Sequence, residues 1–156
     1  MGNDRFFLEH AISIAADGIK EGGGPFGAVI TRRGRIIAES NNRVVLSHDP
    51  TAHAEMIVIR KASELLKTHD LSGCILYTSC EPCPMCLGAV YWAGIKKVVY
   101  ASDRIDAANA GFSDKFIYDE IILNPSARKI KFIRPEDCNG EIVFRKWNEF
   151  EDKIAY

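Results

Sequence analysis

This chain of 156 residues lacks any apolar run approaching the roughly 20 residues that a membrane helix needs. Residues 1–7 have neither the basic start nor the apolar core of a secretion signal. An excess of one charge is also missing, because 20 Lys and Arg residues stand against 21 Asp and Glu residues, a formal net charge of −1. Proteins that bind nucleic acid through its phosphates carry a basic excess. We therefore expect neither a membrane nor a nucleic acid as a partner.

Cysteines are few, and their distribution does not suit a disulfide scaffold. The chain has five, which is an odd number, and three of them are Cys80, Cys83 and Cys86. Such a cluster indicates metal binding in a reducing compartment rather than crosslinking. A cytoplasmic location is the corresponding expectation.

Helical and strand patterns alternate along the chain without a repeat or a linker. Apolar residues at helical spacing predict helices near 4–20, 52–67, 80–93 and 141–153, and a helical stretch near 103–122 that is interrupted at Gly111. Short apolar runs predict strands near 26–32, 35–41, 75–78, 97–101 and 129–133, the first two joined as a hairpin. This order predicts one α/β domain over residues 1–156, with three α/β/α layers and a five-stranded mixed sheet. The segment 49–51, Asp-Pro-Thr, is expected to cap the second helix.

Two short motifs carry the chemistry. His53 and Glu55 stand in a His-Ala-Glu triplet, and thirty residues later Cys83 and Cys86 stand in Pro-Cys-Pro-Met-Cys. The pattern H-x-E followed at a distance by P-C-x-x-C is typical of zinc-dependent deaminases. His53, Cys83 and Cys86 are the expected Zn²⁺ ligands, and three protein ligands leave one position for water, as in catalytic zinc sites. Glu55 is the expected acid and base beside that water.

Two alternatives to this interpretation remain open. Cys80 and Cys83 have the same Cys-x-x-Cys spacing and form a rival ligand pair. We favour Cys83 and Cys86 because Pro82 immediately precedes Cys83, as the pattern requires. The other alternative is a zinc site that only stabilises the fold. Glu55 argues against it, because a structural site has no use for that carboxylate.

Around these motifs, the chain resembles the cytidine deaminase-like superfamily and, within it, the bacterial guanine deaminases. Purine deaminases of the superfamily share the blocks at 23–30, 42, 49–55 and 77–89. The blocks at 106–108, 110–112, 114 and 116–118, together with the terminal tyrosine, point to guanine. The similarity spans nearly the whole chain and is weakest near 124–150.

The resemblance implies a cytidine deaminase-like fold that hydrolyses guanine, a small purine base, to xanthine and ammonia with Zn²⁺. It implies that Phe26 stacks on the base and that Asn42 hydrogen-bonds it. The backbone amides of Ala54 and Cys83 are also expected to face the pocket, since both lie at helix starts. Asp114 would accept from the guanine edge, and Tyr156 would close the pocket. It also implies a homodimer with exchanged C-terminal segments, in which Asp114 and Tyr156 would serve the neighbouring site.

The residues by themselves allow plainer roles and other substrates. Phe26 fits a core strand, Asn42 a turn and Asp114 a loop. A guanosine deaminase would share the early blocks and the terminal tyrosine. A tRNA adenosine deaminase would carry a basic C-terminal helix, whereas residues 141–153 mix acidic and basic side chains.

Overall fold

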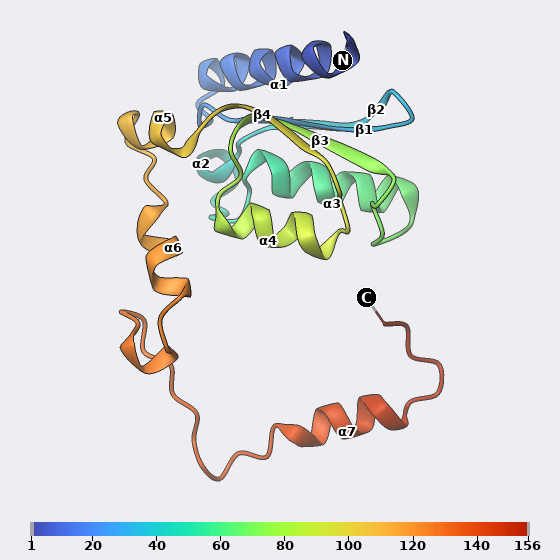
Figure 1. Cartoon of the computed structure of the whole chain (residues 1–156), viewed down its shortest axis with the longest axis vertical. Coiled ribbons are helices and arrows are strands. Elements are labelled where there is room, and N and C mark those ends of the chain that lie inside the picture. The colour runs from blue at the N-terminus through green and yellow to red at the C-terminus, as the bar shows by residue number, and fades with distance from the viewer. Residues whose placement is uncertain (1, 156) are drawn as a thin grey trace. The chain divides into compact units, whose positions relative to one another are not determined.

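A computed structural model describes residues 2–155, which form two units, the first ending at Asp114 and the second beginning at Lys115. The first unit contains all the strands and most of the helices (Figure 1). Its elements are α1 (Gly2–Lys20), β1 (Gly27–Arg32), β2 (Arg35–Asn41), α2 (Val44–Ser47), α3 (Ala54–Leu66), β3 (Cys74–Cys80), α4 (Pro84–Trp92), β4 (Val98–Ser102) and α5 (Arg104–Asn109). None of the helices within residues 2–155 is long and apolar enough to cross a membrane.

The sheet of the first unit is mixed and lies between two layers of helices. Its strand order is β2-β1-β3-β4, with β1 antiparallel to both neighbours and β3 parallel to β4. Figure 1 shows α1 on one face of the sheet and α3 and α4 on the other. The predicted three-layer α/β/α arrangement is therefore confirmed.

Alternation along the central strands builds a core on each face of the sheet, because successive side chains of a strand point to opposite faces. Ile30 of β1 packs in one cluster with Val58 of α3 and Val90 of α4. Its neighbour Val29 packs in a second cluster with Phe7 of α1. Both strand residues are fully buried, so both helical layers are fixed by the same strand.

The predicted fifth strand is absent, and this corrects the predicted strand count to four. The second unit holds α6 (Lys115–Ile121), the 3₁₀ helix η1 (Pro125–Ala127) and α7 (Glu141–Glu149), and residues 129–133 form no strand. A strand needs a sheet edge to pair with, and no described strand pairs with this segment. Its apolar side chains remain exposed, by 73% at Ile130 and 81% at Ile133.

The segment before α3 also differs from its expected role. Asp49 does not cap the helix, because its Oδ1 accepts from the Thr51 amide at 2.8 Å and from the Thr51 hydroxyl at 2.7 Å. This is a side-chain turn. The N-cap of α3 is instead His53. The turn therefore precedes the helix and places His53 at its N-terminus.

Candidate metal and purine site

Two helix N-termini bring the metal-binding side chains together. His53 is the N-cap of α3 and Cys83 is the N-cap of α4, both with extended backbone. Neither side chain makes a capping hydrogen bond with its own helix. Both are therefore free to face each other, and Cys86 joins them from the buried side of α4.

The donor atoms have the spacing of a tetrahedral zinc site. Nδ1 of His53 lies 3.6 Å from Sγ of Cys83 and 3.6 Å from Sγ of Cys86. All three ligand atoms lie within 4.8 Å of one another. Tetrahedral bonds of about 2.3 Å to sulfur and about 2.1 Å to nitrogen separate N and S by about 3.6 Å. The three predicted ligands thus fit Zn²⁺ by distance and by donor type.

The electrostatics of the two thiols suit a cation between them. Hydrogen bonding from Cys86, with a further contribution from His53, lowers the pKa of the Cys83 thiol to about 4. The same bond to Cys83 and then burial raise the pKa of Cys86. The contact with the Cys83 side chain raises the pKa of His53, against the effect of burial. A bound metal ion would take the place of the thiol protons, because thiolates are the zinc-binding form.

Cys80, the rival ligand, points elsewhere. It is buried, and its Sγ donates to the carbonyl of Asp103 at 3.5 Å. Burial raises the pKa of its thiol to about 11. Cys80 is not in the metal-binding group, so the geometry selects Cys83 and Cys86.

Glu55 lies in the first turn of α3, where it is buried against the ligands. Its Oε2 accepts from the Cys86 thiol at 3.7 Å, and its Oε1 accepts from the Thr78 hydroxyl at 3.2 Å. Glu55 is 5% exposed, and burial raises the pKa of its carboxyl group. A raised pKa is a common property of carboxyl groups that carry protons in catalysis.

Phe26 and Asn42 converge just beyond the paired ends of β1 and β2. The backbone amide of Asn42 donates to the carbonyl of Phe26 at 2.8 Å. A Cβ placed on Gly24 would lie 3.5 Å from the Phe26 ring and 3.2 Å from Oδ1 of Asn42. Both side chains therefore border the glycine. The Phe26 ring also meets Phe112 edge-on, with ring centroids 5.0 Å apart.

The remaining predicted residues fall into three situations. Burial and then the negative charge of Cys83 raise the pKa of the Asp114 carboxyl group. Ala54 is the first residue of α3 and fully buried. Its amide belongs to the first turn, whose N–H groups have no partner within the helix. Tyr156 lies outside the described residues.

Three neighbours of the site were not predicted: Thr78, Ser79 and Phe112. Thr78 and Ser79 are buried polar residues at the end of β3, and the Ser79 hydroxyl accepts from the Gly27 amide at 3.0 Å. A hydroxyl pair closing an otherwise apolar strand, just before the Cys motif, was the available signal. Phe112 had none, because its proximity to Phe26 depends on the path of the chain after β4.

A His/Cys/Cys group at two helix N-termini with a buried glutamate beside it defines the class of zinc-dependent deaminases. The chain belongs to the family of cytidine and deoxycytidylate deaminase zinc-binding regions, whose model matches residues 1–102. It therefore uses zinc as its metal, at the group His53, Cys83 and Cys86.

Several relatives match the chain over most of its length. Guanine deaminase of Bacillus subtilis is 51% identical over 99% of both chains. A crystal structure of the B. subtilis enzyme matches with a TM-score of 0.95, covering 97% of this chain and 98% of the other. A guanine deaminase from Nitrosomonas europaea is 37% identical, with a TM-score of 0.67, over 69% of this chain and 63% of its own. The tRNA-specific adenosine deaminase of Aquifex aeolicus is 40% identical over 80% of this chain and 81% of its own.

Proposed function

We propose that this chain catalyses the hydrolytic deamination of guanine to xanthine and ammonia. The choice of guanine is supported by 51% identity to the B. subtilis guanine deaminase over 99% of both chains. The single observation that carries the reaction class is the position of Glu55, buried with one carboxylate oxygen 3.7 Å from the sulfur of Cys86. A carboxylate held against zinc ligands without serving as one is the acid/base arrangement of zinc deaminases.

Glu55 is the proton carrier of the proposed reaction. When bound, zinc supplies the Lewis acidity that makes a water molecule acidic near neutral pH. Glu55 would carry two protons in turn: the first passes from the attacking water to the ring nitrogen, and the second passes from the hydroxyl group so formed to the amine, which leaves as ammonia from the carbon that bore the 2-amino group. The Thr78 hydroxyl holds Oε1 of Glu55 at 3.2 Å, which fixes the carboxylate while it exchanges protons.

Residues beyond the metal group are proposed to select the base. The half-buried ring of Phe26 would stack on the purine, and Asn42 and the Ala54 amide would hydrogen-bond it. Asp114, whose carboxyl pKa is raised by burial and then by the charge of Cys83, would accept a hydrogen bond from the guanine edge. Tyr156 is proposed to close the pocket, as the resemblance implies.

We further propose a cytoplasmic homodimer in which the C-terminal segments are exchanged between copies of the deaminase domain. In the second unit, no described residue is buried. Helix α7 and its C-cap nevertheless expose a stripe of apolar side chains at helical spacing, Phe144, Trp147 and Phe150, by 69%, 42% and 55%. Exposed apolar area of this kind favours association. We propose that a second copy of this chain covers the apolar stripe. Analytical sedimentation of the wild-type chain should show a dimer, and the Trp147→Glu variant should sediment as a monomer. A wild-type chain that sediments as a monomer would contradict the proposal.

Two substrate alternatives remain, and one assay separates them. Guanosine would need room for its ribose, and a tRNA adenosine would need a polyanion-binding surface, which a net charge of −1 does not favour. Ammonia release should be measured in parallel from guanine, guanosine, adenine, cytosine, cytidine and a tRNA anticodon stem-loop. Guanine is expected to react fastest. Turnover of guanosine without turnover of guanine would show that the proposed substrate is wrong. Ammonia release from the tRNA stem-loop alone would identify the chain as a tRNA adenosine deaminase.

The role of Glu55 has its own test. The Glu55→Gln variant should keep its zinc and lose at least about 1,000-fold in kcat, since proton transfer and charge at the reacting water are both removed. Glu64→Gln, which changes an exposed glutamate further along α3, should leave kcat unchanged. Undiminished deamination by zinc-loaded Glu55→Gln would show that the mechanism is wrong.

A further inference from the structure

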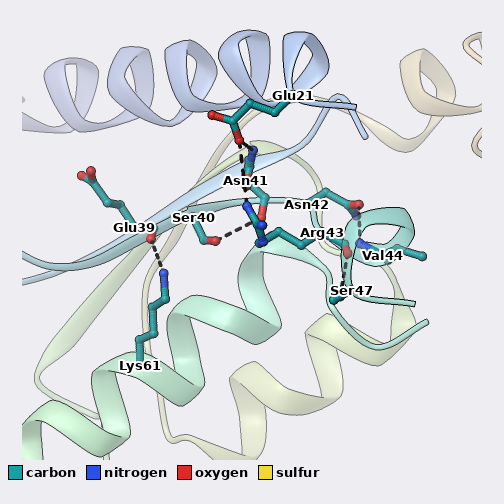
Figure 2. Close-up of polar contacts among 9 residues, drawn as sticks. All are labelled: Glu21, Glu39, Ser40, Asn41, Asn42, Arg43, Val44, Ser47 and Lys61. Carbon is teal, nitrogen blue, oxygen red and sulfur yellow. Dashed lines mark hydrogen bonds and ion pairs between the residues drawn. The ribbon is translucent and has the colours of Figure 1, made fainter. Parts of the chain in front are cut away.

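The strand end that carries Asn42 is fastened to the end of α1, on the opposite side from the zinc helices. Asn41, the last residue of β2, donates from Nδ2 to Oε2 of Glu21 at 3.2 Å (Figure 2). Arg43 lies 3.9 Å from the same carboxylate oxygen. The residues on both sides of Asn42 therefore reach one carboxylate, which follows directly after α1.

Close packing reinforces this attachment. Asn41 is 9% exposed, and a Cβ placed on Gly18 of α1 would lie 2.5 Å from its Nδ2 and 2.6 Å from its Cβ. A Cβ on Gly23 would lie 2.5 Å from the carbonyl oxygen of Asn42. Only glycine allows approach this close, so the end of α1 and the loop after it hold the backbone of residues 41 and 42.

The side chain of Asn42 is oriented by this backbone. Its side-chain Oδ1 accepts from the backbone amide of Val44 at 3.2 Å. The backbone amide of Asn42 donates to the carbonyl of Phe26. That arrangement commits the oxygen to the protein and leaves the NH₂ group for a hydrogen-bond acceptor on the base. Any shift of the strand end would move the donor of Asn42 and the ring of Phe26 together.

We propose that Glu21 and Asn41 form a latch that positions Asn42 for purine binding, so that both are specificity-determining positioning residues. This inference rests on the proposed function, in which Asn42 contacts the base. The side chain of Glu21 is 60% exposed, and exposed charge pairs contribute little to global stability. The effect of the latch therefore falls on KM rather than on folding or on the proton transfer by Glu55.

An exchange of hydrogen-bond polarity tests the latch. Asn41→Asp replaces the donor by a carboxylate that faces Glu21, and should raise KM for guanine about tenfold while kcat changes less than about twofold. Adding Glu21→Gln provides a donor opposite the new carboxylate, and should return KM to within about threefold of wild type. Glu21→Ala, a truncation at an exposed site, should raise KM about fivefold.

The matched control is Asp17→Asn on the same helix. Asp17 pairs with Lys20 at 2.7 Å, both side chains being exposed, and this variant should leave KM unchanged. Zinc content should equal that of wild type in every variant. An unchanged KM in Asn41→Asp, or a raised KM that Glu21→Gln does not rescue, would overturn the latch.

A failure of the proposed function gives a different result. It would appear as wild-type protein that does not turn over guanine. The ¹⁵N side-chain amide signals of Asn42 then test the latch without substrate: they should shift in Asn41→Asp, return in the double variant and stay in place in Asp17→Asn. Unmoved signals in Asn41→Asp would overturn the latch by themselves.

Discussion

The hydroxyl of Thr78 donates a 3.2 Å hydrogen bond to Oε1 of Glu55, joining the end of a central strand to the first turn of α3. Both residues are buried, at 1% and 5% exposure. The bond holds a carboxylate whose other oxygen lies against Cys86. Thr78 therefore connects the rigid sheet to the proposed proton carrier.

The first prediction concerns this bond. Thr78→Val keeps the shape of the side chain but removes the donor, so Glu55 should lose its orientation and kcat should fall about tenfold. Thr78→Ser keeps the hydroxyl and should retain kcat within about threefold. Steady-state kinetics with zinc analysis would decide. Equal activity of the Val and Ser variants would contradict a positioning role for Thr78.

A second prediction separates the rival cysteine pairs. Cys83→Ser and Cys86→Ser each remove one of three ligands, and should weaken zinc binding by at least about 100-fold. Cys80→Ser should retain zinc at wild-type stoichiometry, because its thiol bonds to the carbonyl of Asp103. Metal analysis after dialysis against a weak chelator measures this. Loss of zinc from Cys80→Ser would instead support Cys80 and Cys83 as the ligand pair.

The third prediction tests the contact between α1 and the hairpin. A Cβ on Gly27 would lie 2.3 Å from the carbonyl oxygen of Ala11 and 2.6 Å from the amide of Ala15. Gly27→Ala should therefore cost about 2–4 kcal/mol in the free energy of unfolding, because helix and strand must separate. Gly73→Ala, where the nearest atom is a flexible arginine side-chain nitrogen at 3.7 Å, is the control and should cost under about 1 kcal/mol. Urea titration compares the two.

The fourth prediction is a pH dependence of stability. Burial and then the hydrogen bond from its hydroxyl to Asp4, at 2.7 Å, raise the pKa of Tyr77 to about 12. Because the folded pKa exceeds the unfolded value of about 10, this stabilisation is complete below pH 10 and is lost as the pH rises to about 12.

Tyr77→Phe makes that loss measurable. Below pH 10 the variant should be less stable than wild type by about 1 kcal/mol, the worth of the lost hydrogen bond. Between pH 10 and 12 the stability of wild type alone should fall, so the difference should shrink and then reverse. The control is Tyr91→Phe, since Tyr91 is 77% exposed. A difference between wild type and Tyr77→Phe that stays constant from pH 8 to 12 would be incompatible with the raised pKa.

Much of the first unit was predictable from local pattern. The helix expected near 4–20 is Gly2–Lys20, and the strands expected near 26–32 and 35–41 are Gly27–Arg32 and Arg35–Asn41. These elements have clear apolar periods bounded by glycine turns. The segment expected to form a strand near 129–133 had a similar apolar content but pairs with no described strand, and pairing is not encoded in the segment itself.

Sequence spacing by itself determined the metal chemistry. The motif predicts His53, Cys83 and Cys86 as the ligands, and their residue types favour zinc. Tertiary structure decided the rest. It showed which cysteine pair turns toward His53, and that the Thr78 hydroxyl donates to Glu55. It also showed that Glu21, twenty residues before Asn41, fastens the strand end where Phe26 and Asn42 meet. The physical reason is that ligand identity is a property of single side chains, whereas orientation depends on contacts between segments distant in sequence.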